Sequence, residues 1–329
     1  MIILNRSDVR QALPMAEAIA AMKSAYAALS SGRAEVPLRA RLPVAPHEAL
    51  ALFMPVYLQD DRGEALAVKV VTLFPHNSKR GLPFIHAAVL VFEPDSGRPV
   101  ALLEGGSLTA IRTGAASGAA TDILARSDSR TAAIFGAGVQ ARTQLEAVCT
   151  VRPIQTAWVY DPDLRRVETF IAEMAGRGQV PQDLRAAASA QTAVAQADVI
   201  CTATSSSTPV FVDADLKPGV HINGIGSYTP EMQEVPPETV CRALVVIDSR
   251  SASLSEAGDL IQPIRQSLIS SDHIHAELGE IVLGHRPGRS SPDQVTFFKS
   301  VGVAVQDAAA ARLAINNAQK MRLGQEIEW

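Results

Sequence analysis

The sequence predicts an α/β protein in which a doubly wound parallel sheet is joined to a smaller α+β domain. The chain has 329 residues, more than one ordinary hydrophobic core accommodates, so two domains are expected. From Arg130 onward, apolar runs typical of buried strands alternate with amphipathic helical segments, which indicates a parallel sheet with helices on both faces. Residues 1 to about 112 instead combine one or two helices with several strand-like runs.

The composition argues against several classes of partner. The formal net charge is −4, which provides no general attraction to nucleic acid or to an anionic membrane. No apolar run approaches the roughly 18 residues of a membrane helix, and the N-terminus lacks the pattern of a signal peptide. We expect no metal site and a reducing, cytoplasmic setting, because the cysteines are few, odd in number and widely spaced, at Cys149, Cys201 and Cys241.

The first domain is expected to begin with a helix and to continue as strands. Residues 7–31 carry apolar side chains at helical spacing, with Ser7 or Asp8 as the cap and Gly32 as the stop signal. The sequence EPDSGRP predicts a hairpin in the last of three apolar runs, which lie at residues 49–58, 65–74 and 85–105. Residues 107–125, rich in small side chains, indicate a close-packed helix that leads into the next domain.

The second domain is expected to alternate strands with helices. Helices are predicted over residues 139–151 and 163–178, and strands over residues 131–138, 156–161, 198–206, 221–226 and 243–249. A last helix, over residues 302–324, should pack back across the first domain. We therefore expect a first domain at residues 1–117, completed by the C-terminal helix 306–329, and a second domain at residues 118–305.

A glycine pattern lies directly after the first strand of the second domain, at the start of a helix. Gly136 permits a tight turn, Gly138 lets the backbone approach a pyrophosphate, and Ala141 allows the helix to pack closely on the strand. The N–H groups of the helix N-terminus then point at the phosphates. The pattern predicts a Rossmann-type dinucleotide site whose phosphate loop contains Gly136, Ala137, Gly138, Val139 and Gln140.

An acidic residue ends the next strand, 20 positions beyond Ala141. Asp161 can accept hydrogen bonds from a ribose hydroxyl and would repel a 2′-phosphate, so NAD(H) is favoured over NADP(H) as the cofactor. Arg165 and Arg166 lie nearby and weaken that preference. The alternative is a plain strand–turn–helix in which Asp161 only caps the next helix.

Two further strands end at the edge where a doubly wound sheet usually holds its ligand. Thr202, Ala203 and Thr204 end one strand and would let a cofactor lie close to the backbone, although a Ser/Thr-rich turn without a ligand is the alternative. The other strand breaks at Gly224 in the stretch INGIGSYTPEMQE, whose loop contains Ser227, Tyr228 and Thr229.

Several charged or titratable side chains lie within apolar runs. Lys69, in the run LAVKVVTLF, requires a partner if it is buried, whereas a surface-facing lysine is the alternative. Arg112 starts a helix of small residues, where it could serve packing alone. Arg39 and Arg41 would point to one face, where either could bind a carboxylate. Two histidines in apolar strands are interpreted as core residues rather than catalytic ones, namely His86 and His221.

Nine segments, in matching order over nearly the full chain, resemble the ornithine cyclodeaminase/μ-crystallin family of nicotinamide-dependent enzymes. They include VKVVTLF, EGGSLTAIRTGAASGAAT, IFGAGVQA, LKPGVHINGIGSYTPEMQE and TFFKSVGVAVQDAAAA. The resemblance implies a homodimer whose first domain binds the substrate and forms the subunit interface. It also implies that a substrate carboxylate contacts Arg39, Lys69 and Arg112, and that Met54 lines the same pocket.

On the cofactor side, the resemblance implies that Phe298, Lys299 and Ser300, with Gly302, close over the nicotinamide. Ile225, Gly226 and Ser300 are accordingly expected to bind the cofactor. In ornithine cyclodeaminases, the loop that holds Tyr228 here carries an aspartate that handles protons during deamination. A phenol with an ordinary pKa of about 10 is a poor general base at neutral pH, so Tyr228 would donate a hydrogen bond or shape the pocket.

The expected function is an NAD(P)H-dependent reductase that converts a small, cyclic α-imino acid, such as Δ1-pyrroline-2-carboxylate, into the L-amino acid. The expected catalytic residues are Lys69, Arg112 and Tyr228. An alanine dehydrogenase-like enzyme or open-chain imino-acid reductase is one alternative, and ornithine cyclodeaminase is another. A non-catalytic dinucleotide-binding protein is the alternative from a different class.

Overall fold

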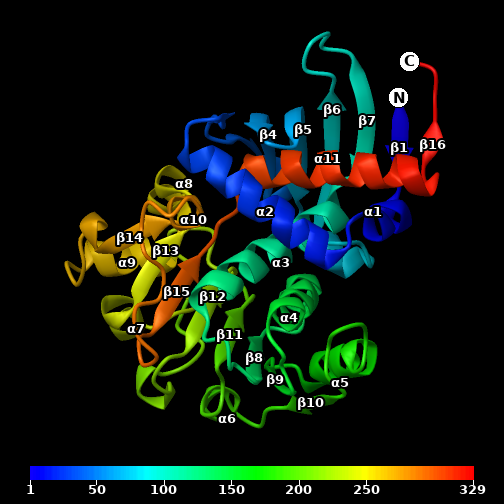
Figure 1. Cartoon of the computed structure of the whole chain (residues 1–329). Coiled ribbons are helices and arrows are strands. Elements are labelled where there is room, and N and C mark those ends of the chain that lie inside the picture. The colour runs from blue at the N-terminus through cyan, green and yellow to red at the C-terminus, as the bar shows by residue number, and fades with distance from the viewer. The chain divides into compact units, whose positions relative to one another are not determined.

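Two separate sheets organise the chain, one in each of two units (Figure 1). The computed structural model describes residues 1–329, with the side chains of residues 1–77 and 79–329. Unit 1 comprises Met1–Arg112 and Val303–Trp329, and unit 2 comprises Thr113–Gly302. The predicted fold class is confirmed, because unit 2 holds a parallel α/β sheet and unit 1 holds a separate mixed sheet.

The sheet of unit 1 has the strand order β16-β1-β7-β6-β5-β4-β2, and β3 pairs with β4 off this path. Its strands are β1 (Ile2–Leu4), β2 (Ala34–Glu35), β3 (Ala40–Val44), β4 (Ala49–Asp60), β5 (Gly63–Leu73), β6 (Ile85–Phe92), β7 (Pro99–Glu104) and β16 (Gln325–Glu326). Its helices are α1 (Arg6–Ala12), α2 (Met15–Ser30), α11 (Ala304–Met321), the first part of α3 (Gly105–Leu124), and the short 3-10 helices η1 (Ala45–His47) and η2 (Pro75–Arg80). The predicted hairpin is confirmed, since β6 and β7 pair antiparallel.

A proline divides the helix that the sequence predicts over residues 7–31. Asn5 caps α1, and its side chain accepts hydrogen bonds from the backbone N–H groups of Ser7 and Asp8. Pro14 then separates α1 from α2, because its ring cannot continue a helix whereas its fixed φ suits a helix start. The cap expected at Ser7 or Asp8 is therefore wrong, since both residues lie inside the first turn.

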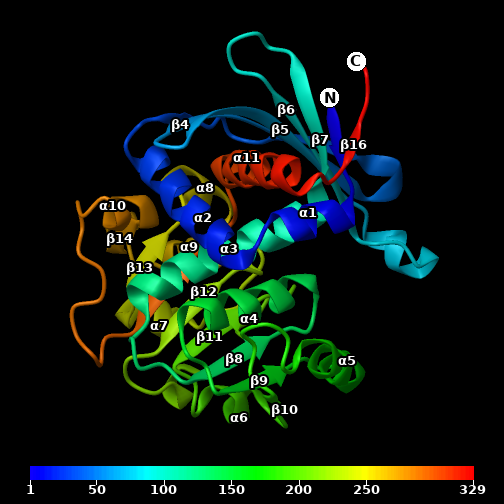
Figure 2. The ribbon, with the colours of Figure 1, turned by 45° about the vertical axis from the view of Figure 1, so that its right-hand side comes forward.

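Helices α2 and α11 cover one face of the sheet of unit 1 (Figures 1 and 2). Alternate residues of β4 and β5 are buried on this face, including Met54 and Lys69, which are direct partners across the two strands. The intervening residues lie on the opposite face, where Phe53 and Pro55 are exposed and Val70 is half-buried. One face of the sheet is thus a core, and the other is an open apolar surface.

Unit 2 contains eight parallel strands in the order β10-β9-β8-β11-β12-β15-β13-β14. They are β8 (Thr131–Phe135), β9 (Thr156–Tyr160), β10 (Asp183–Ala186), β11 (Val199–Thr202), β12 (His221–Gly224), β13 (Leu244–Ile247), β14 (Ile274–Glu277) and β15 (Thr296–Lys299). The chain runs outward from β8 to β10 and returns to β11 on the other side of β8. A topological switch point, where such sheets bind ligands, therefore lies at the carboxyl ends of β8 and β11.

Helices cover both faces of the sheet of unit 2, as the alternation in the sequence predicts (Figure 2). Ala133 and Phe135 join one core and Ala132 and Ile134 the other, because successive residues of β8 point to opposite faces. The helices, besides the end of α3, are α4 (Val139–Val151), α5 (Leu164–Met174), α6 (Ala190–Val194), α7 (Pro237–Arg242), α8 (Arg250–Glu256), α9 (Gly258–Arg265) and α10 (Leu278–Val282), with the 3-10 helices η3 (Asp213–Asp215) and η4 (Ser271–His273). Strands β10, β14 and β15 are not among the predicted ones, because four residues of mixed polarity carry little periodic signal.

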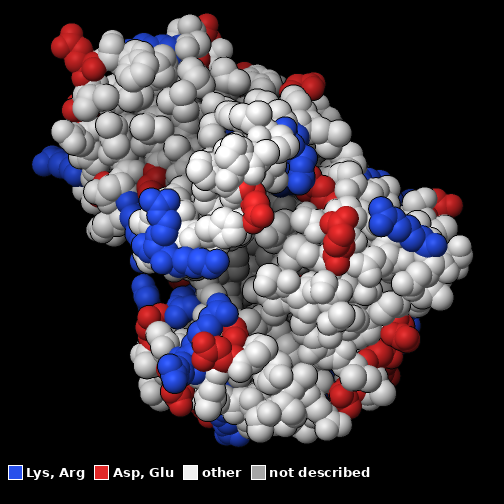
Figure 3. Space-filling view, turned by 180° about the vertical axis from the view of Figure 1, so that it is seen from behind, with Lys and Arg blue, Asp and Glu red and all other residues white. Residues whose placement is uncertain are grey.

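The surface shows a mixture of charges. On the face in Figure 3, Lys and Arg side chains lie interspersed with Asp and Glu. Within the described part of the chain, no helix has the length and apolar character to cross a membrane. Among the side chains of residues 1–77 and 79–329, no group of three or more His, Cys, Asp or Glu could hold a metal ion.

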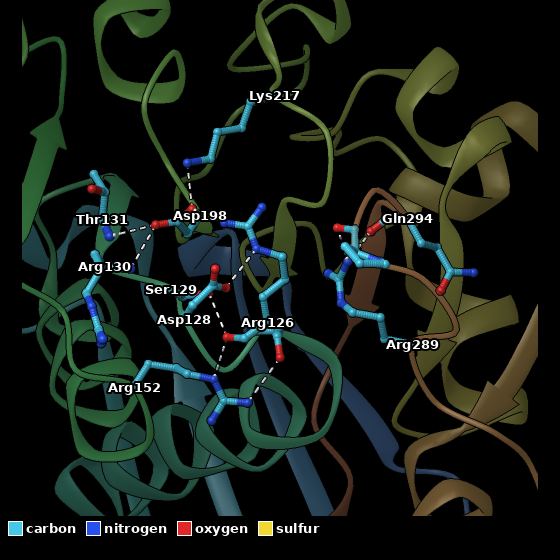
Figure 4. Close-up of polar contacts among 12 residues, drawn as sticks. Arg126, Asp128, Ser129, Arg130, Thr131, Arg152, Asp198, Lys217, Arg289 and Gln294 are labelled. Atoms are coloured by element: carbon cyan, nitrogen blue, oxygen red, sulfur yellow. Dashed lines mark hydrogen bonds and ion pairs between the residues drawn. The ribbon is translucent and has the colours of Figure 1, made fainter.

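A buried carboxylate holds the amino ends of two strands of unit 2 together (Figure 4). Asp198, just before β11, accepts the backbone N–H groups of Arg130 and Thr131 at 2.8 and 3.0 Å. It also pairs with the side chains of Arg126 and Lys217. The edge of the sheet away from the switch point is thus fixed by a charged network.

Two arginines close the C-terminal end of α3 within unit 2 (Figure 4). Arg289 donates a hydrogen bond to the carbonyl of Leu124 at 2.6 Å. Arg152 donates at 2.8–3.1 Å to the carbonyls of Thr121, Asp122, Ala125 and Arg126. The last carbonyls of a helix lack the usual donors from a following turn, so these guanidinium groups supply donors at the end of α3.

Replacement of Arg152 by alanine should destabilise unit 2, because four carbonyls each lose a donor at once. We expect Arg152→Ala to lower the free energy of unfolding by about 2–3 kcal/mol, measured by urea denaturation. Arg130→Ala is the matched control, since that exposed side chain makes one long bond of 3.5 Å, and it should cost less than about 0.5 kcal/mol. Equal effects of the two substitutions would contradict the capping role.

Candidate functional site

Lys69 lies in β5 on the face of the sheet that α2 and α11 cover. Its side chain is 2% exposed, which excludes the surface-facing alternative. Met54, its partner across β4 and β5, is buried beside it. The structure therefore places Lys69 within an apolar layer, where a charged side chain requires a partner.

That partner is Asp307, in the first turn of α11. One carboxylate oxygen of Asp307, Oδ2, lies 2.8 Å from Lys69 Nζ, and the other, Oδ1, lies 3.0 Å from Arg112 Nε. Arg112 also donates to the Gln306 side chain at 2.7 Å, and Gln306 donates in turn to the Tyr26 hydroxyl at 2.7 Å. The structure thus brings Lys69 and Arg112 together on one buried carboxylate.

The surroundings of Lys69 shift its protonation toward neutral pH. Burial lowers the pKa of Lys69 from 10.5 to about 7, and the nearby positive charges of Arg112 and Arg39 act in the same direction. Asp307 opposes this shift, because its negative charge favours the ammonium form. Arg39 is half-buried and Arg41 is exposed. The cluster holds more positive than negative groups, so it would stabilise an added anion.

Gln306 and Asp307 are not among the residues that the sequence singles out. Their signal is visible in the stretch VAVQDAAAARLA, where an amide and an acid interrupt a run of small apolar residues. A buried Lys69 requires an acid, but the sequence alone does not show which acid reaches it.

In unit 2, the phosphate loop joins the end of β8 to the start of α4. Gly136 has a φ of +89°, and a Cβ there would lie 2.6 Å from the carbonyl oxygen of Ala203, so only glycine fits. Gly138 is the N-cap of α4 and has no side-chain cap. A Cβ at Gly138 would meet only Arg166 Nη2, at 3.6 Å, so the space beside it is open. This open cradle, with the first N–H groups of α4 at Val139 and Gln140, fits a pyrophosphate.

Asp161 fixes the phosphate loop from the end of β9. Its Oδ2 accepts the backbone N–H of Ala137 at 2.9 Å and lies 3.4 Å from Arg166 Nη1. Its Oδ1 accepts the N–H of Asp163, and it is Asp163 that caps α5. The alternative in which Asp161 itself caps the next helix is therefore wrong.

The ends of β11 and β12 lie side by side in the sheet. The backbone N–H of Ala203 bonds to the carbonyl of Phe135 in β8, and that of Ile225 bonds to the carbonyl of Thr202. The Thr202 hydroxyl is buried and donates to Glu234, as does the hydroxyl of Thr204. Glu234 also accepts the N–H of Gly226, so a buried carboxylate lies beneath the loops that the sequence assigns to cofactor binding.

Tyr228 is 37% exposed in the loop after β12. Partial burial raises the pKa of Tyr228 above its ordinary value of 10.0, so the phenol stays protonated at neutral pH. It can donate a hydrogen bond, but it cannot act as a base there.

Two residues of the segment expected to close over the nicotinamide, Phe298 and Lys299, lie in the core of unit 2. Phe298 and Lys299 belong to β15, a central strand, and both side chains are fully buried. The Ser300 hydroxyl donates to Asp248 at 2.8 Å, and the N–H of Gly302 bonds to the same oxygen. The expectation that the Phe298 and Lys299 side chains form a cover is wrong, because both are core residues.

The two histidines differ from each other. His221 is a core residue, as expected, and its ring nitrogens bond to Thr296 and Asn223. Burial lowers the pKa of His221 to about 3, so it stays neutral. His86 is exposed at the start of β6, so its interpretation as a core residue is wrong.

Comparison with known proteins gives consistent matches along the chain. Residues 1–322 match the model of the ornithine cyclodeaminase/mu-crystallin family. The Delta(1)-pyrroline-2-carboxylate reductase of Bacillus cereus is 40% identical over 100% of both chains. The Delta(1)-pyrroline-2-carboxylate reductase of Thermococcus litoralis, solved in complex with NADH and L-proline, is 43% identical, with a TM-score of 0.94 over 99% of this chain and 100% of that chain.

A dimeric archaeal alanine dehydrogenase with bound NAD is 29% identical, with a TM-score of 0.92 over 100% of this chain and 99% of that chain. These matches confirm the family that the sequence resembles. The chain therefore belongs to the ornithine cyclodeaminase/mu-crystallin family.

Proposed function

We propose that the protein is an NAD(P)H-dependent oxidoreductase that reduces the C=N bond of a small, cyclic α-imino acid, such as Δ1-pyrroline-2-carboxylate, to the L-amino acid. The observation that carries this proposal is the buried cluster in which Lys69 and Arg112 share Asp307. Its excess positive charge suits the carboxylate of such a substrate. The full-length similarity to two Delta(1)-pyrroline-2-carboxylate reductases supports the same substrate class.

In this proposal the residues of unit 1 bind and orient the imino acid. Arg112 and Lys69, with Arg39, hold its carboxylate, and Met54 lines the pocket. When bound, a reduced nicotinamide supplies the hydride that the imine carbon accepts. Lys69, with a pKa of about 7, can hold or release a proton near neutral pH, and a protonated imine is the better acceptor. Fixing the carboxylate contributes to the rate by holding the reacting carbon in one orientation.

Tyr228 is the residue that argues for imine reduction rather than cyclodeamination. The aspartate that the resemblance places in this loop of ornithine cyclodeaminases is replaced here by a phenol that stays protonated. We assign Tyr228 a hydrogen-bonding or shaping role, which an imine reduction accommodates.

For the cofactor, we propose that Gly136 to Gln140 hold the pyrophosphate and that Ile225, Gly226, Ser300 and the Thr202–Thr204 segment complete the site. NAD(H) is favoured over NADP(H), because the Asp161 carboxylate lies at the end of β9 and disfavours a 2′-phosphate. Arg166, whose side chain is 55% exposed beside Asp161, reduces this discrimination. NADPH should therefore be a poorer cofactor but not an excluded one.

We also propose a homodimer that forms through unit 1 and works in the cytoplasm. The open face of its sheet carries apolar residues on neighbouring strands, including Phe53, Pro55, Val68 and Val70, and such a face favours association. The alanine dehydrogenase of similar structure is a dimer.

The cytoplasmic setting is supported by the buried thiols. Cys149 and Cys201 are free, and burial raises the pKa of each to about 12, which suits a reducing compartment.

The central test is the reaction itself. With Δ1-pyrroline-2-carboxylate at pH 6 to 8, we expect NADH oxidation and formation of L-proline, with a higher kcat/KM for NADH than for NADPH. Lys69→Met should lower kcat/KM by about 100-fold, because one carboxylate contact is lost in a buried site. An absence of NADH oxidation would refute the proposal, whereas a rate that depends on pyruvate and ammonium would favour the alanine dehydrogenase alternative.

The lowered pKa of Lys69 predicts a pH dependence of product binding. Lys69 is protonated below about pH 7 and neutral above it, while the carboxylate of L-proline stays ionised throughout. We therefore expect the Kd of L-proline, measured by calorimetry with NADH present, to rise about tenfold between pH 6 and pH 8.5. Lys69→Arg keeps its charge and should flatten this profile. A flat wild-type profile would contradict the assignment.

The dimer is tested by sedimentation velocity. We expect a species of about twice the chain mass of 34.9 kDa. Phe53→Glu should produce monomers, because a charge would be buried in the interface. Leu254→Glu is a matched control in unit 2, since Leu254 is 38% exposed and Phe53 is 37% exposed. A dimer that survives Phe53→Glu would place the interface elsewhere.

A further inference from the structure

Glu234 is a fully buried carboxylate at the carboxyl ends of β11 and β12, within unit 2. Its Oε1 accepts the backbone N–H of Thr204 at 2.6 Å and the Thr204 hydroxyl at 2.7 Å. Its Oε2 accepts the Thr202 hydroxyl at 2.9 Å and the N–H groups of Gly226 and Ser227 at 2.6 and 3.2 Å. One oxygen therefore bonds only to the loop after β11, and the other bonds chiefly to the loop after β12.

The two loops touch directly above this carboxylate. A Cβ at Gly226 would lie 2.1 Å from the carbonyl oxygen of Thr204 and 2.4 Å from Glu234 Oε1. No side chain fits at position 226, so the backbones approach as closely as glycine permits. The spacing of the two loops thus depends on Gly226 and on the carboxylate that bonds to both.

A second buried pair holds Glu234 in place. Asp259 Oδ1 accepts the backbone N–H groups of Glu234 and Val235 at 2.7 and 3.0 Å. Asp259 Oδ2 lies 3.1 Å from Lys299 Nζ, which also donates to the carbonyl of Gly224 at 3.1 Å. Lys299, whose side chain has no place in a cover over the nicotinamide, instead supplies the positive charge of this cluster.

The donors around Glu234 favour its ionised form. Burial and the negative charge of Asp259 raise the pKa of Glu234, while Lys299 and the bonds from Thr204 oppose that shift. Three of its five partners are backbone N–H groups, which can only donate. A carboxylate has two acceptor oxygens for these five donors, whereas an amide has one oxygen and an NH₂ group that would face an N–H.

We propose that Glu234 is a positioning residue for the nicotinamide cofactor: it holds the loops after β11 and β12 at the spacing at which their backbone receives the ligand. This inference rests on the proposed function, in which these loops bind the cofactor. Glu234 itself is buried beneath the loops and acts through Thr204 and Gly226. No other carboxylate in the part of the chain with described side chains bonds to both of these residues.

The test is Glu234→Gln, read by NADH binding to the free protein. We expect the Kd for NADH, measured by fluorescence titration, to rise at least about tenfold, because one side of the junction loses its acceptor. At saturating NADH the KM for the imino acid should change less than about threefold, since the carboxylate site in unit 1 is untouched. Glu231→Gln is the matched control, because Glu231 is exposed in the same loop, and its Kd for NADH should stay within about twofold of wild type.

Thr202→Val provides a milder second variant. It keeps the shape of the side chain and removes one donor to Glu234, so the Kd for NADH should rise about threefold. A folded Glu234→Gln protein that binds NADH like wild type would overturn the inference, even if its thermal stability falls. If Glu234→Gln fails to fold, an unchanged Kd in Thr202→Val overturns it. Wild-type protein that does not bind NADH would instead refute the proposed function.

Discussion

The buried cations of unit 1 depend on one carboxylate, that of Asp307. It lies between Lys69 and Arg112 and is the acid that lets both cations remain in an apolar layer. A buried ion pair contributes little to net stability, because desolvation of the charges offsets most of their attraction. In the proposed function its value is arrangement, since it places two cations side by side for a substrate carboxylate, and the pKa of Lys69 is lowered to about 7.

Unit 2 also contains carboxylates that organise their surroundings, since two of them accept hydrogen bonds from the backbone of loops. Asp161 bonds to the backbone of the phosphate loop at Ala137, and Glu234 bonds to the loops after β11 and β12. The carboxyl ends of parallel strands carry loops rather than regular structure, so their backbone N–H groups require other acceptors. Buried carboxylates meet this need, and they connect the loops at this edge of the sheet.

Several features of the site follow from local sequence. Gly136 predicts a tight turn, because its backbone conformation and the close carbonyl of Ala203 admit only glycine, and Gly138 predicts an open helix start. The structure shows both. A lysine in the middle of the run LAVKVVTLF indicates a buried charge in need of a partner. The identity of that partner does not follow, because Lys69 and Asp307 lie far apart in the sequence and meet only when α11 packs on the sheet. Phe298 and Lys299 show the converse, since a segment placed by resemblance alone proves to be a core strand.

By itself, the sequence determined the fold class, the glycine turn after β8 and the family, because periodicity, glycine positions and ordered motifs are properties of neighbouring residues. Only the tertiary structure decided which carboxylate serves which cation or loop. Asp161 serves the loop rather than the helix cap, Asp307 serves Lys69 and Arg112, and Glu234 serves the ends of β11 and β12. The physical reason is that a buried charge is paired by whatever group the packing of distant elements brings within hydrogen-bonding distance.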